Sequence, residues 1–177
     1  MRTLCRFFKI IIEDFKRDNP LEILFIWFAN AVPNLFIFRV IKTAFLRAAG
    51  VEVLWNGMYF KSPIIINSPR NLKISHGVFL NSNVMFEGAG KVVIGSNCQI
   101  GPNVIFATTN HDIADNMGTS VADIRVEDNV WIGAGSIILG GIQIGPNVVV
   151  AAGAVVNRSF SNSMLAGIPA RCIQQLN

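Results

Sequence analysis

The chain has 177 residues, of which 51% are hydrophobic and 15% are charged, and its formal net charge is +4. This is the length of one ordinary domain with its own core, and the composition is too apolar and too weakly charged for a disordered chain. The three cysteines, Cys5, Cys98 and Cys172, lie far apart and form no CxxC pair. This spacing disfavours a disulfide framework or a zinc finger and favours a reducing, cytosolic compartment.

Two different kinds of polypeptide meet near Gly50. Residues 1–47 contain eight Lys/Arg and four Asp/Glu, whereas residues 48–177 contain seven of each sign. The first 49 residues contain no glycine, although the chain has 15. We therefore expect an amphipathic helical segment over residues 1–49, a repeat region over 50–160 and a C-terminal tail over 161–177.

The pattern of residues 1–49, the front segment, predicts two or three amphipathic helices. Apolar residues between Leu4 and Phe15 recur at helical spacing and make one stripe. Asp18-Asn19-Pro20 ends this helix and caps the next one, which lies in the apolar run 21–38. A third helical piece follows and carries the basic residues Arg39, Lys42 and Arg47.

Two roles stay open for residues 1–47. A membrane-spanning helix is not expected, because the longest charge-free stretch, residues 23–38, is interrupted by Pro33 and is shorter than the roughly 20 apolar residues needed. The helices either cover the end of the following domain or pack on partner subunits, or they lie in a membrane interface with Lys and Arg facing lipid headgroups. Nucleic-acid binding is not expected, since acidic residues dilute the basic ones.

A six-residue period begins after Gly50. Breaks in the period fall at residues 87–90 and, as a longer loop excursion, at 107–125. The hexad positions are all apolar: Leu54, Phe60, Ile66, Leu72, Val78, Val84, Ile94, Ile100, Phe106, Val126, Ile132, Ile138, Ile144, Val150 and Val156. Each hexad is expected to form a short strand and a turn, with one large side chain pointing to a central axis.

Glycine and asparagine mark the turns of this repeat. Gly95, Gly101, Gly133 and Gly145 follow apolar hexad residues, and Asn97, Asn103 and Asn147 come two positions later. We expect both residue types to supply turn conformations that a β-branched residue disfavours. Stacked short repeats of this kind predict a parallel β-helix. A β-sandwich with coincidental spacing is the alternative, and no helices of the length that a doubly wound sheet needs lie between the strands.

The last fifty residues carry a family resemblance. The segments Val-Trp-Ile-Gly-Ala-Gly-Ser-Ile-Ile from residue 130, Ile-Gln-Ile-Gly-Pro-Asn-Val from 142 and Ala-Gly-Ile-Pro-Ala-Arg from 166 resemble hexapeptide-repeat O-acetyltransferases of the maltose/galactoside type, including surface-polysaccharide enzymes. The resemblance implies a mainly β fold, a left-handed parallel β-helix, and a homotrimer with active sites between neighbouring subunits. It also implies acetyl-CoA as co-substrate and a saccharide as acceptor.

The resemblance implies that His111 is the catalytic base. The chain has only two histidines, and His111 lies inside the long break of the repeat, where a loop leaves the rigid scaffold. Acyl transfer to an alcohol needs such a base. Asn110 and Asp112 flank His111 and are candidate substrate-binding residues, although a backbone carbonyl could orient the ring equally well. His76, in a repeat turn, is expected to be structural or exposed.

Other positions match the family's binding residues. Asn81 matches an asparagine that contacts the acceptor or the acyl group, whereas Glu87 is expected to be an exposed turn residue. For acetyl-CoA, Trp131 matches an aromatic residue of the cleft, and Ala134 and Ala152 match small residues that expose backbone groups to the pantetheine arm. The remaining cofactor-binding candidates match positions near the nucleotide: Asn157, Arg158 and Arg171. A second basic position after Arg171 is Gln174 here.

The sequence therefore predicts an O-acetyltransferase that moves acetyl from acetyl-CoA to a sugar hydroxyl of a bacterial surface glycan or its lipid-linked precursor. It would act in the cytoplasm or peripherally at the inner face of the membrane. A non-catalytic trimeric scaffold at the membrane and a serine acetyltransferase-like enzyme are the alternatives. A γ-class carbonic anhydrase needs more histidines than the two present, so we expect no metal. Cys98 is expected to be structural rather than a nucleophile.

Overall fold

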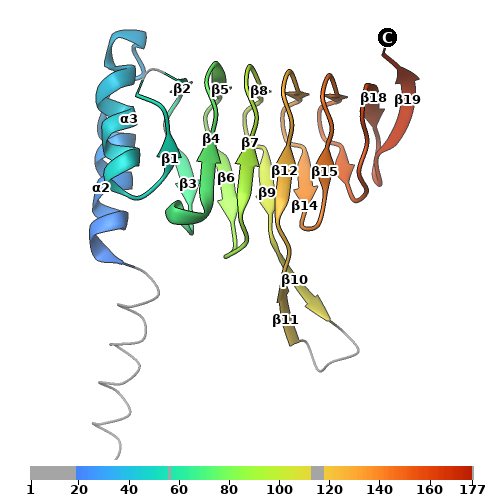
Figure 1. The fold of residues 1–177 in the computed structure, drawn as a ribbon, viewed down its shortest axis with the longest axis horizontal. Coiled ribbons are helices and arrows are strands. Elements are labelled where there is room, and N and C mark those ends of the chain that lie inside the picture. The colour runs from blue at the N-terminus through green and yellow to red at the C-terminus, as the bar shows by residue number, and fades with distance from the viewer. Residues whose placement is uncertain (1–18, 56, 113–117, 177) are drawn as a thin grey trace, which may run out of the picture.

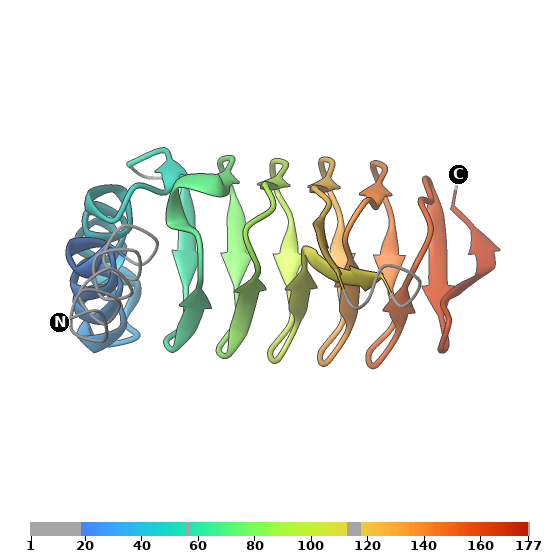
Figure 2. The same ribbon diagram turned by 90° about the horizontal axis from the view of Figure 1, so that it is seen from below.

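The structure, a computed structural model, describes residues 19–55, 57–112 and 118–176. The apolar stripe predicted between Leu4 and Phe15 therefore lies outside the described residues. Short strands stack as successive turns of a three-sided coil, with helices at one end and the two C-terminal strands at the other (Figures 1 and 2). The parallel β-helix expected from the hexads is confirmed.

Three sheets form the sides of the coil. Sheet A contains β1 (Glu52–Val53), β4 (Leu72–Ile74), β7 (Val92–Ile94), β12 (Ile124–Val126) and β15 (Gln143–Ile144). Sheet B contains β2 (Met58–Phe60), β5 (Val78–Leu80), β8 (Gln99–Ile100), β13 (Trp131–Ile132), β16 (Val149–Val150), β18 (Ser163–Ala166) and β19 (Arg171–Gln175). Sheet C contains β3 (Ile64–Ile66), β6 (Val84–Glu87), β9 (Ile105–Ala107), β14 (Ile137–Leu139) and β17 (Val155–Val156).

Only β19 runs antiparallel to its neighbour within these three sheets, where it pairs with β18. Both strands lie in residues 161–177. A short 3₁₀ helix, η2 (Pro69–Asn71), precedes β4.

The hexad residues fill the axis of the coil, as predicted, with one exception. All of them are buried except Leu54, which is 59% exposed. Leu54 follows the end of β1, so Val53 occupies the inward position and pairs with Ile74. Most sides of a coil also bury two side chains rather than the expected one, as Val78 and Leu80 do, because alternate residues of a strand face the same way.

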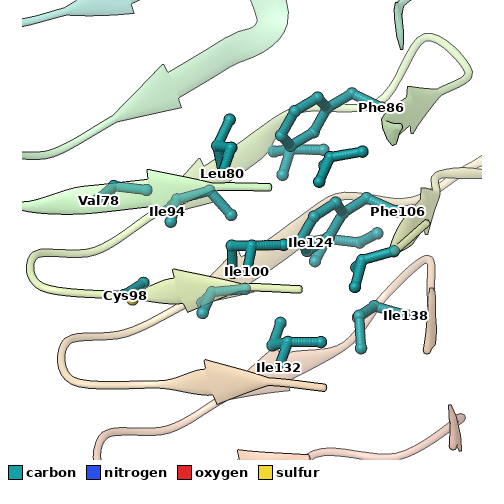
Figure 3. Packing of buried hydrophobic residues seen from close by; sticks show 14 of the residues in the cluster. Val78, Leu80, Phe86, Ile94, Cys98, Ile100, Phe106, Ile124, Ile132 and Ile138 are labelled. Carbon is teal, nitrogen blue, oxygen red and sulfur yellow. The ribbon is translucent and has the colours of Figure 1, made fainter. Parts of the chain in front are cut away.

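These inward residues form columns along the axis (Figure 3). Leu80, Ile100 and Ile132 lie above one another on sheet B. On sheet C, the rings of Phe86 and Phe106 stack with centroids 5.0 Å apart and planes 4° apart. Each coil thus covers the apolar surface of the next one, and burial of this surface, at about 25 cal/mol per Å², drives the stacking.

Asparagine supplies special turn conformations, as predicted, but the hexad glycines do not. Asn97, Asn103 and Asn147 have φ values of 59°, 59° and 54°, in the left-handed region. The hexad glycines do not have positive φ. At Gly101 and Gly133, a Cβ atom would instead lie 2.7 Å from the backbone N of Ala134 and 2.5 Å from that of Ala152. Glycine is needed there because successive coils approach too closely for any side chain.

The helices of the front segment cover the first coil. Helix α2 (Pro20–Ala31) begins as predicted, with the Asn19 side chain accepting a hydrogen bond from the Leu21 N–H at 3.1 Å. After η1 (Phe36–Phe38) comes α3 (Arg39–Ala48). Ala29 from α2 and Leu46 from α3 are fully buried and belong to the same apolar core as the β-helix. This packing supports the prediction that the helices cover the end of the domain.

Two asparagines complete the open edge of the first coil. The Asn30 side chain donates to the Ile64 carbonyl at 2.9 Å and accepts from the Ile64 N–H at 3.0 Å. Asn34 likewise accepts from the Ser62 N–H at 2.8 Å. The unpaired edge of a sheet otherwise recruits another strand, so these side chains end the stack.

Lys42 does not face lipid headgroups, although the membrane-interface alternative required this of the basic residues. It is 1% exposed. Its Nζ atom donates to Asn34 Oδ1 at 2.5 Å and to Ser62 Oγ at 2.9 Å, and lies 4.4 Å from the centroid of the Phe60 ring. Burial lowers the pKa of Lys42 to about 8.

Lys42 is expected to make the stability rise with pH. The folded chain releases the proton near pH 8 and the unfolded chain near 10.5, so the free energy of unfolding increases between these values. Burial raises the pKa of Cys98 to about 11, which lowers the stability as pH rises from 9 to 11. Urea unfolding at several pH values measures the free energy of unfolding. This free energy should rise above pH 8 in the wild type, whereas in Lys42→Met it should only fall between pH 9 and 11. If the free energy of unfolding depended on pH in the same way in both proteins, Lys42 would not be the cause of the rise.

Within the described ranges, residues 19–55, 57–112 and 118–176, none of the helices combines the length and apolarity that crossing a bilayer requires.

Candidate active site

One row of outward-facing residues runs along sheet B. Strand register places these residues side by side on successive coils, because each pairs with the next across neighbouring strands. The row consists of Tyr59, Phe79, Gln99, Trp131, Val149 and Met164. A cleft follows this row and contains some of the predicted site residues.

The C-terminal half of the cleft brings together four of them. A cavity of about 420 Å³ is lined by Asn81, Trp131, Ala134 and Ala152, among mostly apolar neighbours. Trp131 is 57% exposed although it lies on a strand. These residues lie up to 71 positions apart in the sequence, so only the coil brings them to one surface.

Backbone donors are available in this cavity. Among the described residues, the N–H groups of Ala134 and Ala152 have no hydrogen-bond acceptor. The close approach at Gly101 and Gly133 stacks these two turns directly on each other. An unsatisfied N–H group is costly unless water or a ligand accepts its hydrogen. The cavity therefore presents two exposed amides, one coil apart, to an elongated ligand that carries carbonyl groups.

The side-chain amide of Asn81 is fixed at the edge of the cavity. Its Oδ1 atom accepts a hydrogen bond from the Ser82 N–H at 2.9 Å. This leaves the Nδ2 group as the donor that a ligand oxygen can use.

His111 lies on a hairpin that leaves the coil on another side. Strands β10 (Thr109–Asp112) and β11 (Gly118–Val121) pair antiparallel, with His111 opposite Thr119. The hairpin connects β9 of sheet C with β12 of sheet A, and it projects away from the prism (Figure 1). Sheet B is the remaining side, so the structure does not bring His111 into the cleft of its own chain. Asn110 and Asp112 lie on the same strand as His111.

Thr108 anchors the base of this hairpin. It is fully buried, and its hydroxyl donates to the Glu87 carbonyl at 2.8 Å and accepts from the Gly90 N–H at 3.0 Å. Its carbonyl accepts from the Ala122 N–H, which closes the hairpin. The residues of the first break in the repeat thus hold the start of the second, longer excursion.

Thr108→Val is expected to loosen the hairpin without changing the shape of the core. It removes both hydroxyl hydrogen bonds and leaves the buried Gly90 N–H unpaired, which costs about 1–3 kcal/mol, whereas the Glu87 carbonyl still accepts from the Thr108 N–H. Hydrogen exchange measured by mass spectrometry should become faster in residues 108–122. Thr43→Val, which removes one hydroxyl bond within α3, is the matched control and should leave exchange in the hairpin unchanged. Equal protection in Thr108→Val and wild type would contradict this role.

The predicted nucleotide-binding residues lie at the C-terminal end. Asn157 and Arg158 follow β17 on sheet C and are exposed. Arg171 begins β19, and its guanidinium donates to the Ala170 carbonyl at 2.9 Å. β19 extends sheet B beyond β18, which supplies Met164 to the cavity. Arg171 and Gln174 are thus on the cleft's own sheet, and Asn157 and Arg158 are not. None of these four residues is among those that line the cavity.

The other predicted chemical residues lie elsewhere. His76 is exposed in a turn, with Nδ1 3.2 Å from Ser96 Oγ. Cys98 is fully buried, and its thiol donates to the Glu127 carbonyl at 3.1 Å. With a pKa of about 11, it is a thiol rather than a thiolate at neutral pH, as expected for a structural residue. Glu87 is half-buried at the end of β6 rather than in an exposed turn.

Sequence reasoning missed the N-terminal half of the cleft. A second cavity, of about 500 Å³, shares Phe79 and Gln99 with the first and is also lined by Phe36, Arg39 and Tyr59. Phe36 and Arg39 come from the helical segment, whose role was assigned from its own apolar pattern rather than from contact with sheet B. The 20-residue spacing of Tyr59, Phe79 and Gln99 is the signal that could have found the row.

The repeat matches a known family model. Residues 123–158 match the model described as bacterial transferase hexapeptide (six repeats). The chain is a hexapeptide-repeat protein. It is 31% identical over 124 residues to the galactoside O-acetyltransferase of Escherichia coli strain K12, a match that covers 67% of this chain and 61% of that enzyme. The chain thus spans less than two thirds of the length of this relative.

Solved structures of hexapeptide-repeat proteins share the fold. A hexapeptide-repeat acetyltransferase of Vibrio cholerae, complexed with acetyl coenzyme A, aligns with a TM-score of 0.75 at 26% identity, covering 92% of this chain and 86% of that one. A maltose O-acetyltransferase of Clostridium difficile aligns with a TM-score of 0.78 at 28% identity, covering 95% and 89%. The expected family resemblance and the left-handed form of the β-helix are thereby confirmed.

Proposed function

We propose that this hexapeptide-repeat protein is an acetyl-CoA-dependent O-acetyltransferase that acts on a saccharide hydroxyl. The observation that carries the proposal is the cavity on sheet B, where the exposed N–H groups of Ala134 and Ala152 lie beside Trp131. Relatives named as galactoside and maltose O-acetyltransferases, and a neighbour that binds acetyl coenzyme A, support the same activity.

The cavity suits the donor in size and chemistry. The pantetheine arm is a narrow chain with two amide carbonyls, which can accept hydrogen bonds from N–H groups one coil apart. Apolar lining residues, including Trp131 and Met164, would cover its methylene groups. At the C-terminal end, the exposed cations Arg158 and Arg171 would favour the phosphates of the nucleotide.

The complete site requires a second copy of the chain. His111 leaves the prism between sheets C and A, whereas the cavity lies on sheet B. In a symmetric homotrimer, the hairpin of one copy can reach the cleft of the next, so that three equivalent sites form. We therefore propose the trimer as the active form.

In this assembly, the imidazole of His111 takes the proton of the acceptor hydroxyl as its oxygen attacks the thioester carbonyl. The Nδ2 group of Asn81, whose Oδ1 atom is occupied by the Ser82 N–H, donates in this proposal to the oxyanion that forms. Collapse breaks the carbon–sulfur bond, and the proton returns from the imidazole to the leaving thiolate. The products are the acetyl ester and coenzyme A, and no acyl-enzyme forms.

We propose that the acceptor is a bacterial surface glycan or its lipid-linked precursor, reached from the cytoplasmic side of a membrane. The support is an exposed apolar surface on α2 and η1, where Ile23, Trp27 and Ile37 are 57%, 61% and 78% exposed. Interfacial helices bury such residues in the acyl boundary.

Membrane contact can be tested without removing the helices. Deleting residues 1–47 would uncover the first coil, because Leu46 and Lys42 are buried against it. A Trp27→Gln, Ile37→Gln variant changes only exposed side chains. It should bind less to sedimenting anionic phospholipid vesicles than the wild type does. Equal binding of both proteins, or binding of neither, would count against contact through this surface.

The direct test of the proposed function is coenzyme A release from acetyl-CoA with a panel of acceptors. The panel should contain free sugars, lipid-linked sugars and serine. Turnover with saccharides and not with serine supports the proposal. Turnover with serine alone favours a serine acetyltransferase-like enzyme, and absence of acetyl-CoA binding favours a scaffold.

A further inference from the structure

Three aromatic rings line the cavity of about 500 Å³ in the N-terminal half of the cleft. Tyr59 and Phe79 stack with centroids 5.6 Å apart and planes 19° apart, and the Phe36 ring lies 5.8 Å from that of Tyr59. The Tyr59 hydroxyl donates to the Asn34 carbonyl at 2.9 Å, so the polar end of this side chain is satisfied within the protein. The Arg39 guanidinium packs on Phe36, 4.0 Å from the ring centroid, and Arg39 is the only charged residue among the described lining residues. This half of the cleft is therefore an apolar groove.

The two ends of this groove differ in polarity. At one end Phe36 lies on η1 and is 62% exposed, beside Ile37, which is 78% exposed. At the other end Gln99 lies between Phe79 and Trp131 in the outward-facing row of sheet B. Gln99 lines both cavities of the cleft, and its exposed side-chain amide makes no hydrogen bond with another described residue. The groove thus runs from an exposed apolar surface to an unpaired amide beside the cavity proposed for acetyl-CoA.

We infer that this groove binds the apolar chain of an amphiphilic acceptor, whose saccharide end lies at Gln99. An alkyl or isoprenoid chain buries its methylene groups against the rings, and the Gln99 amide bonds a sugar hydroxyl as donor or acceptor. Two coils separate Tyr59 from Gln99, which is about 10 Å, so the groove has room for a chain of several methylene groups.

The polarity of the groove favours this occupant over others. An occupant that is apolar throughout would leave the Gln99 amide unpaired, and a free sugar would leave the ring surface of Tyr59 and Phe36 in water. The identification of the amphiphile as the acceptor rests on the proposed function, because the groove meets the acetyl-CoA cavity at Phe79 and Gln99.

The test is isothermal titration of the full chain, without acetyl-CoA, with methyl, butyl and octyl β-glucoside and with 1-octanol. The glucosides share one sugar and differ in chain length, whereas octanol has the chain alone. Below micelle-forming concentrations, octyl glucoside should bind at least about tenfold more tightly than methyl glucoside, since burial of about two methylene groups supplies this factor. Octyl glucoside should also bind more tightly than octanol, because only the glucoside brings a sugar to Gln99.

Variants assign each preference to one end of the groove. Phe36→Gln removes a ring from the cavity and should reduce the preference for octyl over methyl glucoside. Ile37→Gln changes the next residue, which is exposed and outside the described lining, and should leave that preference unchanged. Gln99→Leu should remove most of the preference for octyl glucoside over octanol, and Gln143→Leu, at an exposed position on sheet A, is its matched control. Thermal unfolding checks that each variant is folded.

Several binding results would overturn the inference. One is equal affinity for methyl and octyl glucoside. Failure of octyl glucoside to bind would mean that another occupant, such as a second copy of the chain, fills the groove. Octanol that binds as tightly as octyl glucoside would make the groove a site without a saccharide end. A chain-length preference that is unchanged in Phe36→Gln would place the apolar chain elsewhere.

Acetyl transfer to the same glucosides separates this inference from the proposed function. Turnover whose KM does not depend on chain length would support the transferase and contradict the groove. A protein that prefers octyl glucoside in binding and transfers acetyl to no saccharide would contradict the transferase and leave the groove assigned to an amphiphile.

Discussion

Replacing His111 with alanine is expected to lower kcat for acetyl transfer by about 10²–10⁴-fold, because the acceptor hydroxyl then loses its base. Acetyl-CoA should bind as tightly as before, since the cavity with the exposed Ala134 and Ala152 amides does not include His111. Coenzyme A release measures the first effect, and titration with acetyl-CoA measures the second.

His76→Ala is the matched control for this prediction. His76 is the second histidine of the chain and lies in an exposed turn, outside the cleft on sheet B. We expect its substitution to leave turnover unchanged. If His111→Ala retained turnover, or if both variants lost it equally, His111 would not be the base.

Ala152→Phe is expected to weaken acetyl-CoA binding by at least about tenfold, because a large side chain would fill the cavity on sheet B. The Ala152 backbone has no positive φ, and its side chain is exposed, so the fold should tolerate the change. Ala48→Phe, at an exposed position on α3, is the control and should bind acetyl-CoA normally. Unchanged binding to Ala152→Phe would place the donor elsewhere.

The repeat made most of the β-helix predictable. An apolar residue every six positions sets where each strand faces the axis, and local steric preferences at Asn97 and Asn103 set the turns. Leu54 followed the same spacing and still faces solvent, because β1 ends before it and the first coil has no earlier coil to pair with. Sequence spacing carries no information about which hexad begins the stack.

The predicted site residues came from short motifs within single coils, and their placement depends on the stacking of coils. Asn81, Trp131, Ala134 and Ala152 meet because the coils are in register. The aromatic row of Tyr59 and Phe79 was missed because the prediction rested on the apolar hexad positions that face the axis and not on the outward-facing positions between them. The burial of Lys42 was not predicted, because its acceptors, Asn34 and Ser62, lie 8 and 20 residues away in the sequence and no local pattern indicates contact with them.

The central claim is that each active site combines the cleft of one copy with His111 of another. Complementation between two impaired variants, His111→Ala and Ala152→Phe, tests it most directly. Each variant would carry a different affinity tag, and the two would be refolded together so that mixed oligomers form and can be purified through both tags.

If the sites are shared, a copy with an intact cleft can receive the intact hairpin of its neighbour. Each mixed trimer then has one of its three sites intact, so the oligomers purified through both tags should recover about a third of wild-type activity. Mixed oligomers whose activity is no higher than that of the two parent variants would contradict the shared site.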